Sequence, residues 1–184
     1  MNLLINIAAF KLGWISSVVG GAQQLPWLGP LVVFIAVAIH LARAERPHSE
    51  MLLILSCGLI GAVFDSALVA AGWVTFPSGM FSESMAPYWI VTMWMLFGTT
   101  INMSMRWMRG RPLLAAAFGF VGGPLAYVAG HKIGGIQFVD QGPAIAMLAI
   151  GWAVMMPVLM HLGERFDGVS PQSSGGDVVA QRVS

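Results

Sequence analysis

Long apolar runs separated by short polar segments are the feature that most limits how this chain can fold. Six runs come close to the roughly 20 apolar residues that a helix needs to cross a bilayer, and they cover residues 3–21, 27–42, 51–72, 88–107, 112–130 and 143–162. Charged side chains make up 9% of the 184 residues, against about 25% in a soluble domain, which is too few to cover a water-exposed surface. The sequence therefore predicts an all-α fold, a polytopic membrane bundle of six transmembrane helices.

Basic residues are distributed unevenly along the chain. Seven of the nine lie at or beyond the ends of the second, fourth and sixth runs, whereas Lys132 lies in an opposite loop and Lys11 lies within the first run. Because lysine and arginine are retained on the cytoplasmic side, this pattern predicts that both termini are cytoplasmic and that the chain is a multi-pass protein of the bacterial inner membrane. The seven are Arg43, Arg46, Arg106, Arg109, Arg111, Arg165 and Arg182.

The end of the chain is rich in Ser, Gly and Gln, which is typical of disordered segments. We therefore expect a transmembrane domain over residues 1–166 and a disordered cytoplasmic tail over residues 167–184. The formal net charge of +1 provides no broad basic surface, so nucleic acid is not expected as a partner. Cys57 is the single cysteine, and no metal or cofactor motif is recognisable, so neither a metal nor a cofactor is expected.

Two charged residues lie deep inside the predicted spans, away from the span ends. Lys11 is near the middle of the first span, and Asp65 lies in the outer half of the third. A charge in a transmembrane helix is costly and usually faces a partner or a functional cavity, so the two residues are expected to form a pair. Either the pair carries chemistry, with Asp65 and Lys11 as catalytic residues, or it locks the packing of two helices.

The fourth span combines aromatic residues with small polar ones. Trp89, Trp94 and Phe97 precede a polar group that includes Thr100 and Asn102. Either the polar side chains bond across helices as packing contacts, or they line a polar cavity beneath the aromatic rings. Tyr127, which follows a Gly-Gly-Pro break in the fifth span, is a further candidate for lining a ligand site.

The fifth span carries small residues at intervals of four, at Ala115, Gly119 and Gly123. Such a stripe lets a second helix backbone approach closely. It predicts a helix-packing face, which a second copy of the chain or another membrane protein could also use.

Several short motifs together resemble a bacterial inner-membrane family that is known only as a domain of unknown function. The resemblance covers residues 2–162 and implies one membrane domain, no soluble module and no established activity. The motifs are Asp65, Phe76-Pro77-Ser78-Gly79, Pro87-x-Trp89, Trp94-x-x-Phe97 with Thr99-Thr100, Arg106-Trp107, and Gly122-Gly123-Pro124-x-x-Tyr127.

A fainter likeness is to the small membrane lycopene cyclase domains. In those domains, an Asp near a span end is followed by Gly-Trp, Phe-Pro and a Pro that opens the next helix; here the matching positions are Asp65, 72–73, 76–77 and Pro87. The cyclases continue with paired glutamates that protonate a polyene. This chain has Tyr88 and Trp89 instead, which removes the acid that the cyclase reaction needs.

Two hypotheses from different classes follow. In the first, the protein is a membrane enzyme, or an accessory to one, that acts on a lipid or isoprenoid. Asp65 would be the acid or base and Lys11 its modulator, while aromatic walls at Trp89 and Trp94 would suit a long apolar or cationic molecule. In the second, it is a non-catalytic scaffold or complex subunit. A small-molecule transporter is a third candidate, which the lack of an internal repeat disfavours. Membrane lipids are expected partners in every case.

Overall fold

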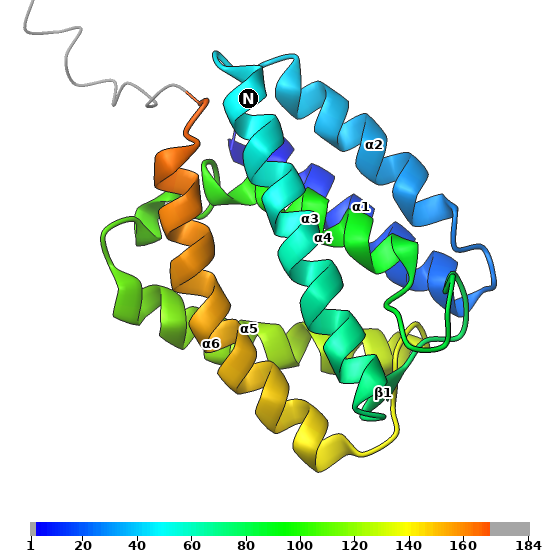
Figure 1. Ribbon diagram of the computed structural model, residues 1–184. Coiled ribbons are helices and arrows are strands. Elements are labelled where there is room, and N and C mark those ends of the chain that lie inside the picture. The colour runs from blue at the N-terminus through cyan, green and yellow to red at the C-terminus, as the bar shows by residue number, and fades with distance from the viewer. Residues whose placement is uncertain (1–2, 170–184) are drawn as a thin grey trace, which may run out of the picture.

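The computed structural model describes residues 3–169 as a bundle of six α-helices, with one short 3-10 helix and two short strands between them (Figure 1). In chain order the elements are α1 (Leu3–Ala22), α2 (Leu28–Leu41), α3 (Pro47–Ala70), β1 (Val74–Thr75), α4 (Tyr88–Ile101), η1 (Arg106–Met108), α5 (Pro112–Ile133), β2 (Gln137–Phe138) and α6 (Gln141–Arg165). The predicted all-α fold is confirmed. Of the predicted tail, residues 170–184 lie outside the described residues.

Four helices of the described region, α1, α3, α5 and α6, are long and apolar enough to cross a membrane. Their outward faces expose large apolar side chains, among them Leu59, Leu113 and Leu125, a distribution that suits lipid rather than water. Helices α2 and α4 are also apolar, but each has 14 residues. At about 1.5 Å per residue each is about 21 Å long, which is shorter than a hydrocarbon core of about 30 Å.

Helix α4 is the centre of the bundle. Ten of its 14 residues are buried, and it packs against α3, α2 and α1. Helices α5 and α6 pack along each other as a hairpin, and this hairpin makes fewer contacts with the other helices than they make among themselves. Figure 1 shows α5 running across the lower part of the bundle, away from α2. The boundary between the hairpin and the other helices is therefore the natural place for a cavity.

The loops gather at two ends of the bundle. At one end β1 pairs antiparallel with β2, and the Gln24 side chain donates a hydrogen bond to the Pro77 carbonyl, 3.0 Å away. The α1–α2, α3–α4 and α5–α6 connections therefore lie together. At the other end, arginines from the α2–α3 and α4–α5 connections meet at Asp167, which follows α6. Consecutive helices thus run back and forth between the same two ends.

The fourth helix ends earlier than predicted. We expected a helix over residues 88–107, but α4 ends at Ile101 and the chain turns into η1. Thr99 and Thr100 donate their hydroxyl protons to carbonyls three residues earlier, and the Asn102 side chain is held by residues of other segments. Because side chains that bond to nearby backbone compete with helix propagation, the polar group marks the end of α4.

The small-residue stripe of the fifth helix faces α6. Ala115, Gly119 and Gly123 are all buried, and a Cβ added to Gly119 would lie 2.2 Å from the carbonyl oxygen of Trp152. The stripe therefore packs against α6 within the chain, and its use by a second copy or another membrane protein stays a prediction.

Substituting Gly123 by alanine is expected to destabilise the fold. The added Cβ would lie 2.2 Å from Cγ of Trp152, and such overpacking costs about 1–3 kcal/mol. Gly122→Ala is the matched control, because its Cβ would have 3.7 Å to the nearest atom, a ring carbon of Phe118. Thermal unfolding of the detergent-solubilised variants measures the difference. Equal melting temperatures for the two variants would contradict the close packing of α5 on α6.

Candidate functional site

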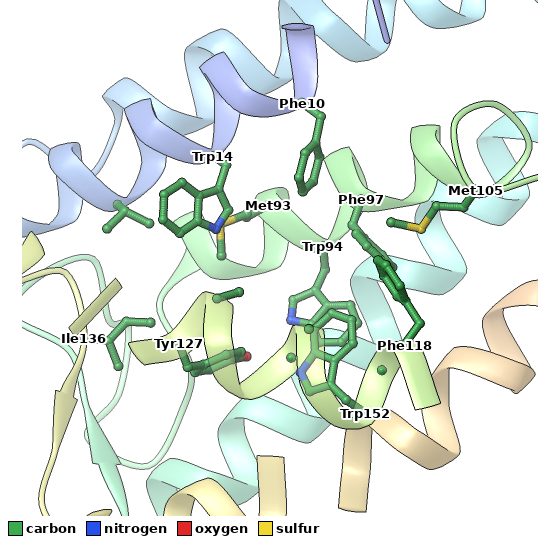
Figure 2. A pocket seen from close by; sticks show the side chains of 15 residues that line it. Phe10, Trp14, Met93, Trp94, Phe97, Met105, Phe118, Tyr127, Ile136 and Trp152 are labelled. Atoms are coloured by element: carbon green, nitrogen blue, oxygen red, sulfur yellow. The ribbon is translucent and has the colours of Figure 1, made fainter. Parts of the chain in front are cut away.

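A cavity of about 190 Å³ lies between the α5–α6 hairpin and helices α1 and α4. Its wall is almost entirely apolar, and seven of its 15 lining residues are aromatic and come from four helices (Figure 2). An apolar cavity of about 150 Å³ accepts a molecule the size of benzene, so this cavity has room for one ring or a short branched alkyl group. The aromatic lining residues are Phe10 and Trp14 of α1, Trp94 and Phe97 of α4, Phe118 and Tyr127 of α5, and Trp152 of α6.

Asp65 of α3 lies behind this wall and is completely buried. Trp94 donates its indole N–H to Oδ2 at 2.7 Å, and Tyr127 donates its hydroxyl proton to Oδ1 at 2.5 Å. The polar atoms of both aromatic residues are therefore directed at the carboxylate, while their rings line the cavity. Asp65 thus fixes the orientation of two cavity walls without lining the cavity itself.

Trp152 forms the third part of this arrangement. Its ring stacks on Trp94 with 4.5 Å between ring centroids and 17° between ring planes. Two glycines make room for the pair, because a Cβ on Gly61 would lie 2.0 Å from Trp94 and a Cβ on Gly123 would lie 2.2 Å from Trp152. The two stacked rings are therefore closely packed by α3 and α5.

The predicted Lys11–Asp65 pair is absent from the structure of residues 3–169. Lys11 is exposed on the outer face of α1, whereas Asp65 is 0% exposed and bonded to two aromatic residues. A lysine can extend its long side chain towards the membrane surface and so avoid burial, which removes the need for a carboxylate partner.

The ligand-lining residues predicted from the sequence separate into two groups. Trp94, Phe97 and Tyr127 line the cavity. Trp89 does not, because its indole N–H bonds to the Ser78 carbonyl at 3.0 Å and its ring packs against the loop. The Thr100 hydroxyl donates to a backbone carbonyl of its own helix, and Asn102 lies at the arginine-rich end.

A second polar centre lies at that end and is built around Glu50, which is completely buried. His40 Nε2 lies 2.8 Å from one carboxylate oxygen, while the Asn102 side chain and the Gly168 amide donate to the other at 2.7 and 2.8 Å. Nδ1 of His40 is buried, and it has no hydrogen-bond partner among residues 3–169. The centre joins α2, α3 and α4 to the chain that follows α6.

The same end holds an ion-pair cluster around Asp167. Arg106 and Arg109 pair with its two carboxylate oxygens at 2.8 and 2.7 Å, and Arg46 donates to its backbone carbonyl. Partial burial would raise the pKa of Asp167. Hydrogen bonds from Arg109 and the Val169 amide, together with the charges of the two arginines, outweigh this and hold the pKa below its usual range.

Sequence reasoning missed Trp152 and Glu50. A tryptophan in the middle of a span, away from the interfaces where tryptophans gather, is a signal that Trp152 faces the bundle interior. Glu50 precedes the apolar run of the third span by one residue, and this position is also typical of a loop residue. Within residues 3–169, no group of three or more His, Cys, Asp or Glu side chains is placed to hold a metal ion.

One family model matches most of the chain. Residues 3–158 match the family described as "Protein of unknown function (DUF2878)", and the matched range includes Asp65 and the whole cavity wall. The chain belongs to this family. The resemblance to a family of unknown function is thereby confirmed. No curated protein and no solved structure matches the chain, and the likeness to the lycopene cyclase domains has no support. The Asp167 cluster lies partly beyond the matched range.

The ion pairs of Asp167 are expected to lose their stabilising effect in acid. Because the folded-state pKa lies below the unfolded value of about 3.9, the contribution is present above about pH 4 and is lost as the pH falls through the lowered folded pKa. The free energy of unfolding of wild type should exceed that of Asp167→Asn by about 1 kcal/mol or less at pH 6, and the difference should shrink as the pH falls below about 4.

Melting temperatures of the two proteins at both pH values measure this effect. Glu83→Gln, at an exposed acid in the loop at the opposite end, is the control. A stability difference between wild type and Asp167→Asn that stays constant from pH 6 to pH 3 would contradict the assignment.

Proposed function

We propose that this protein spans the bacterial inner membrane and binds a lipid- or isoprenoid-like apolar molecule in its aromatic cavity. The observation that carries the proposal is the cavity wall, to which four helices contribute aromatic rings. Trp94 and Tyr127 direct their hydrogen-bonding groups to Asp65, so the parts of their rings that line the cavity present apolar surface to a ligand. A concave apolar site inside a membrane protein suits a molecule that is already dissolved in the bilayer.

Six membrane crossings with both termini in the cytoplasm are part of this proposal. The loops alternate between two ends of the bundle, which supports a crossing by every helix, including the short α2 and α4. A short helix is tolerated where protein rather than lipid surrounds it, and α4 is largely buried. Six arginines lie at the end that holds Asp167, whereas Lys132 lies near the other end, which supports a cytoplasmic location for the arginine-rich end. The six are Arg43, Arg46, Arg106, Arg109, Arg111 and Arg165.

The geometry supports binding more strongly than catalysis. Both oxygens of Asp65 are engaged by Trp94 and Tyr127, and the carboxylate does not line the cavity. The short contact between Tyr127 and Asp65 does favour a second candidate, in which the hydroxyl proton of Tyr127 moves to Asp65 and the phenol oxygen takes a proton from a bound lipid or isoprenoid, which is left as the conjugate base. In the scaffold alternative, these residues pack helices and the cavity stays empty.

Filling the cavity is expected to remove ligand binding. Ala126 lines the cavity, so Ala126→Phe places a ring where the ligand would lie. Leu125→Phe is the matched control, because Leu125 is 62% exposed on the outer face of the same helix. Native mass spectrometry of the proteins released from membranes should show a bound apolar molecule with wild type and Leu125→Phe. At least a tenfold lower occupancy is expected with Ala126→Phe, corresponding to a loss of about 1.4 kcal/mol or more.

Equal ligand occupancy in Ala126→Phe and Leu125→Phe would contradict the binding proposal. An empty wild-type protein would favour the scaffold. A chemically altered lipid that accumulates with wild type but not with Tyr127→Phe would favour the enzyme.

The orientation has its own test. Alkaline phosphatase, which is active in the periplasm, should be inactive when fused after Arg165 and active when fused after Phe81 in the α3–α4 loop. The positions lie at opposite ends of the bundle, and a six-span chain with cytoplasmic termini separates them by the membrane. Phosphatase activity after Arg165 would overturn this topology.

A further inference from the structure

Asp65 has no cationic partner in the part of the chain that the structure describes. None of the ion pairs found within residues 3–169 includes it, and its two hydrogen bonds come from the neutral groups of Trp94 and Tyr127. A carboxylate deep inside a membrane protein is costly unless an opposite charge balances it. The side chains that line the adjacent cavity include no Lys, Arg or His, so residues 3–169 place no positive charge there.

The rings that bond to Asp65 are also cavity walls. Hydrogen bonding to a carboxylate polarises the donor, which makes the rings of Trp94 and Tyr127 richer in electron density. Aromatic faces attract cations, tryptophan most strongly, and this attraction grows when the site is free of water. The cavity therefore combines aromatic surfaces with a negative charge directly behind two of them.

The chemistry of the wall limits which cation can be bound. A primary ammonium group or a guanidinium needs hydrogen-bond acceptors, whereas the lining is almost entirely apolar. A fully alkylated ammonium has no N–H to satisfy and presents methyl groups to the rings. Such a head is about the size of the small apolar molecules that cavities of this volume accept.

Building on the proposed function, we infer that the ligand of the aromatic cavity is a cationic amphiphile whose quaternary ammonium head lies against Trp94, Tyr127 and Trp152, with Asp65 as its countercharge. The hydrocarbon chain leaves the cavity towards the surrounding lipid. Asp65 acts here through two aromatic rings and does not touch the ligand.

Two probes of equal shape test this inference. Hexyltrimethylammonium carries the positive head, and 2,2-dimethyloctane replaces its nitrogen by carbon and is neutral. Both are titrated into the full chain in lipid nanodiscs, with tryptophan fluorescence as the readout and empty nanodiscs as the blank for partitioning into lipid. We expect wild type to bind the cation about tenfold more tightly than the neutral probe.

Variants then assign the preference to Asp65. Asp65→Asn removes the negative charge at nearly constant volume, and should weaken binding of the cation about tenfold more than it weakens binding of the neutral probe. Tyr127→Phe keeps the ring but removes the hydrogen bond, and should weaken cation binding in the same direction. Ala126→Phe should abolish binding of both probes, whereas Leu125→Phe should change neither.

Each outcome decides one claim. If wild type binds both probes equally, the cationic ligand is excluded while the apolar binding site stands. Tighter binding of the cation that is insensitive to both Asp65→Asn and Tyr127→Phe rules out Asp65 as the countercharge. If neither probe binds to wild type, the proposed function fails together with the inference. The comparison in wild type needs no variant to fold.

Discussion

The carboxylate of Asp65 ties three helices together in the interior of the bundle. It belongs to α3, and it accepts one hydrogen bond from α4 through Trp94 and one from α5 through Tyr127. In an environment without water these bonds face little competition, and an unsatisfied carboxylate there would be costly. The bond to Tyr127 crosses the sparsely packed boundary between the α5–α6 hairpin and the other helices, so the position of the cavity walls depends on it.

Close packing at the tryptophan stack complements this polar link. Lipid is as apolar as the side chains, so helices in a membrane associate through van der Waals contact and interhelical hydrogen bonds rather than through the hydrophobic effect. Gly61 and Gly123 let α3 and α5 approach the stacked rings of Trp94 and Trp152 to contact distance. Polar bonding and small-residue packing thus act at the same depth and make the aromatic wall rigid.

The sequence predicted the fold better than it predicted the partners of its polar residues. Apolar runs located all six helices, since each helix is apolar along most of its length. The end of α4 depended on side-chain bonds of Thr99 and Thr100 that no hydropathy pattern records. Asp65 stood out as a buried acid, and charge pairing suggested Lys11. Its actual hydrogen-bond partners are the indole of Trp94 and the phenol of Tyr127. The sequence does not distinguish these side chains from ordinary packing residues, and their distance from Asp65 depends on how α4 and α5 cross.

The hydrogen-bond partners of Glu50 in the second polar centre come from distant parts of the chain, and this has a consequence for biogenesis. Glu50 accepts hydrogen bonds from Asn102 and from the Gly168 amide, which lie 52 and 118 residues further along the chain. When α3 leaves the ribosome, His40 is the partner already synthesised, and the last donor emerges after α6. Closure of this end is therefore a late step in assembly, and a nascent chain that stops before residue 168 lacks a group that a buried glutamate requires.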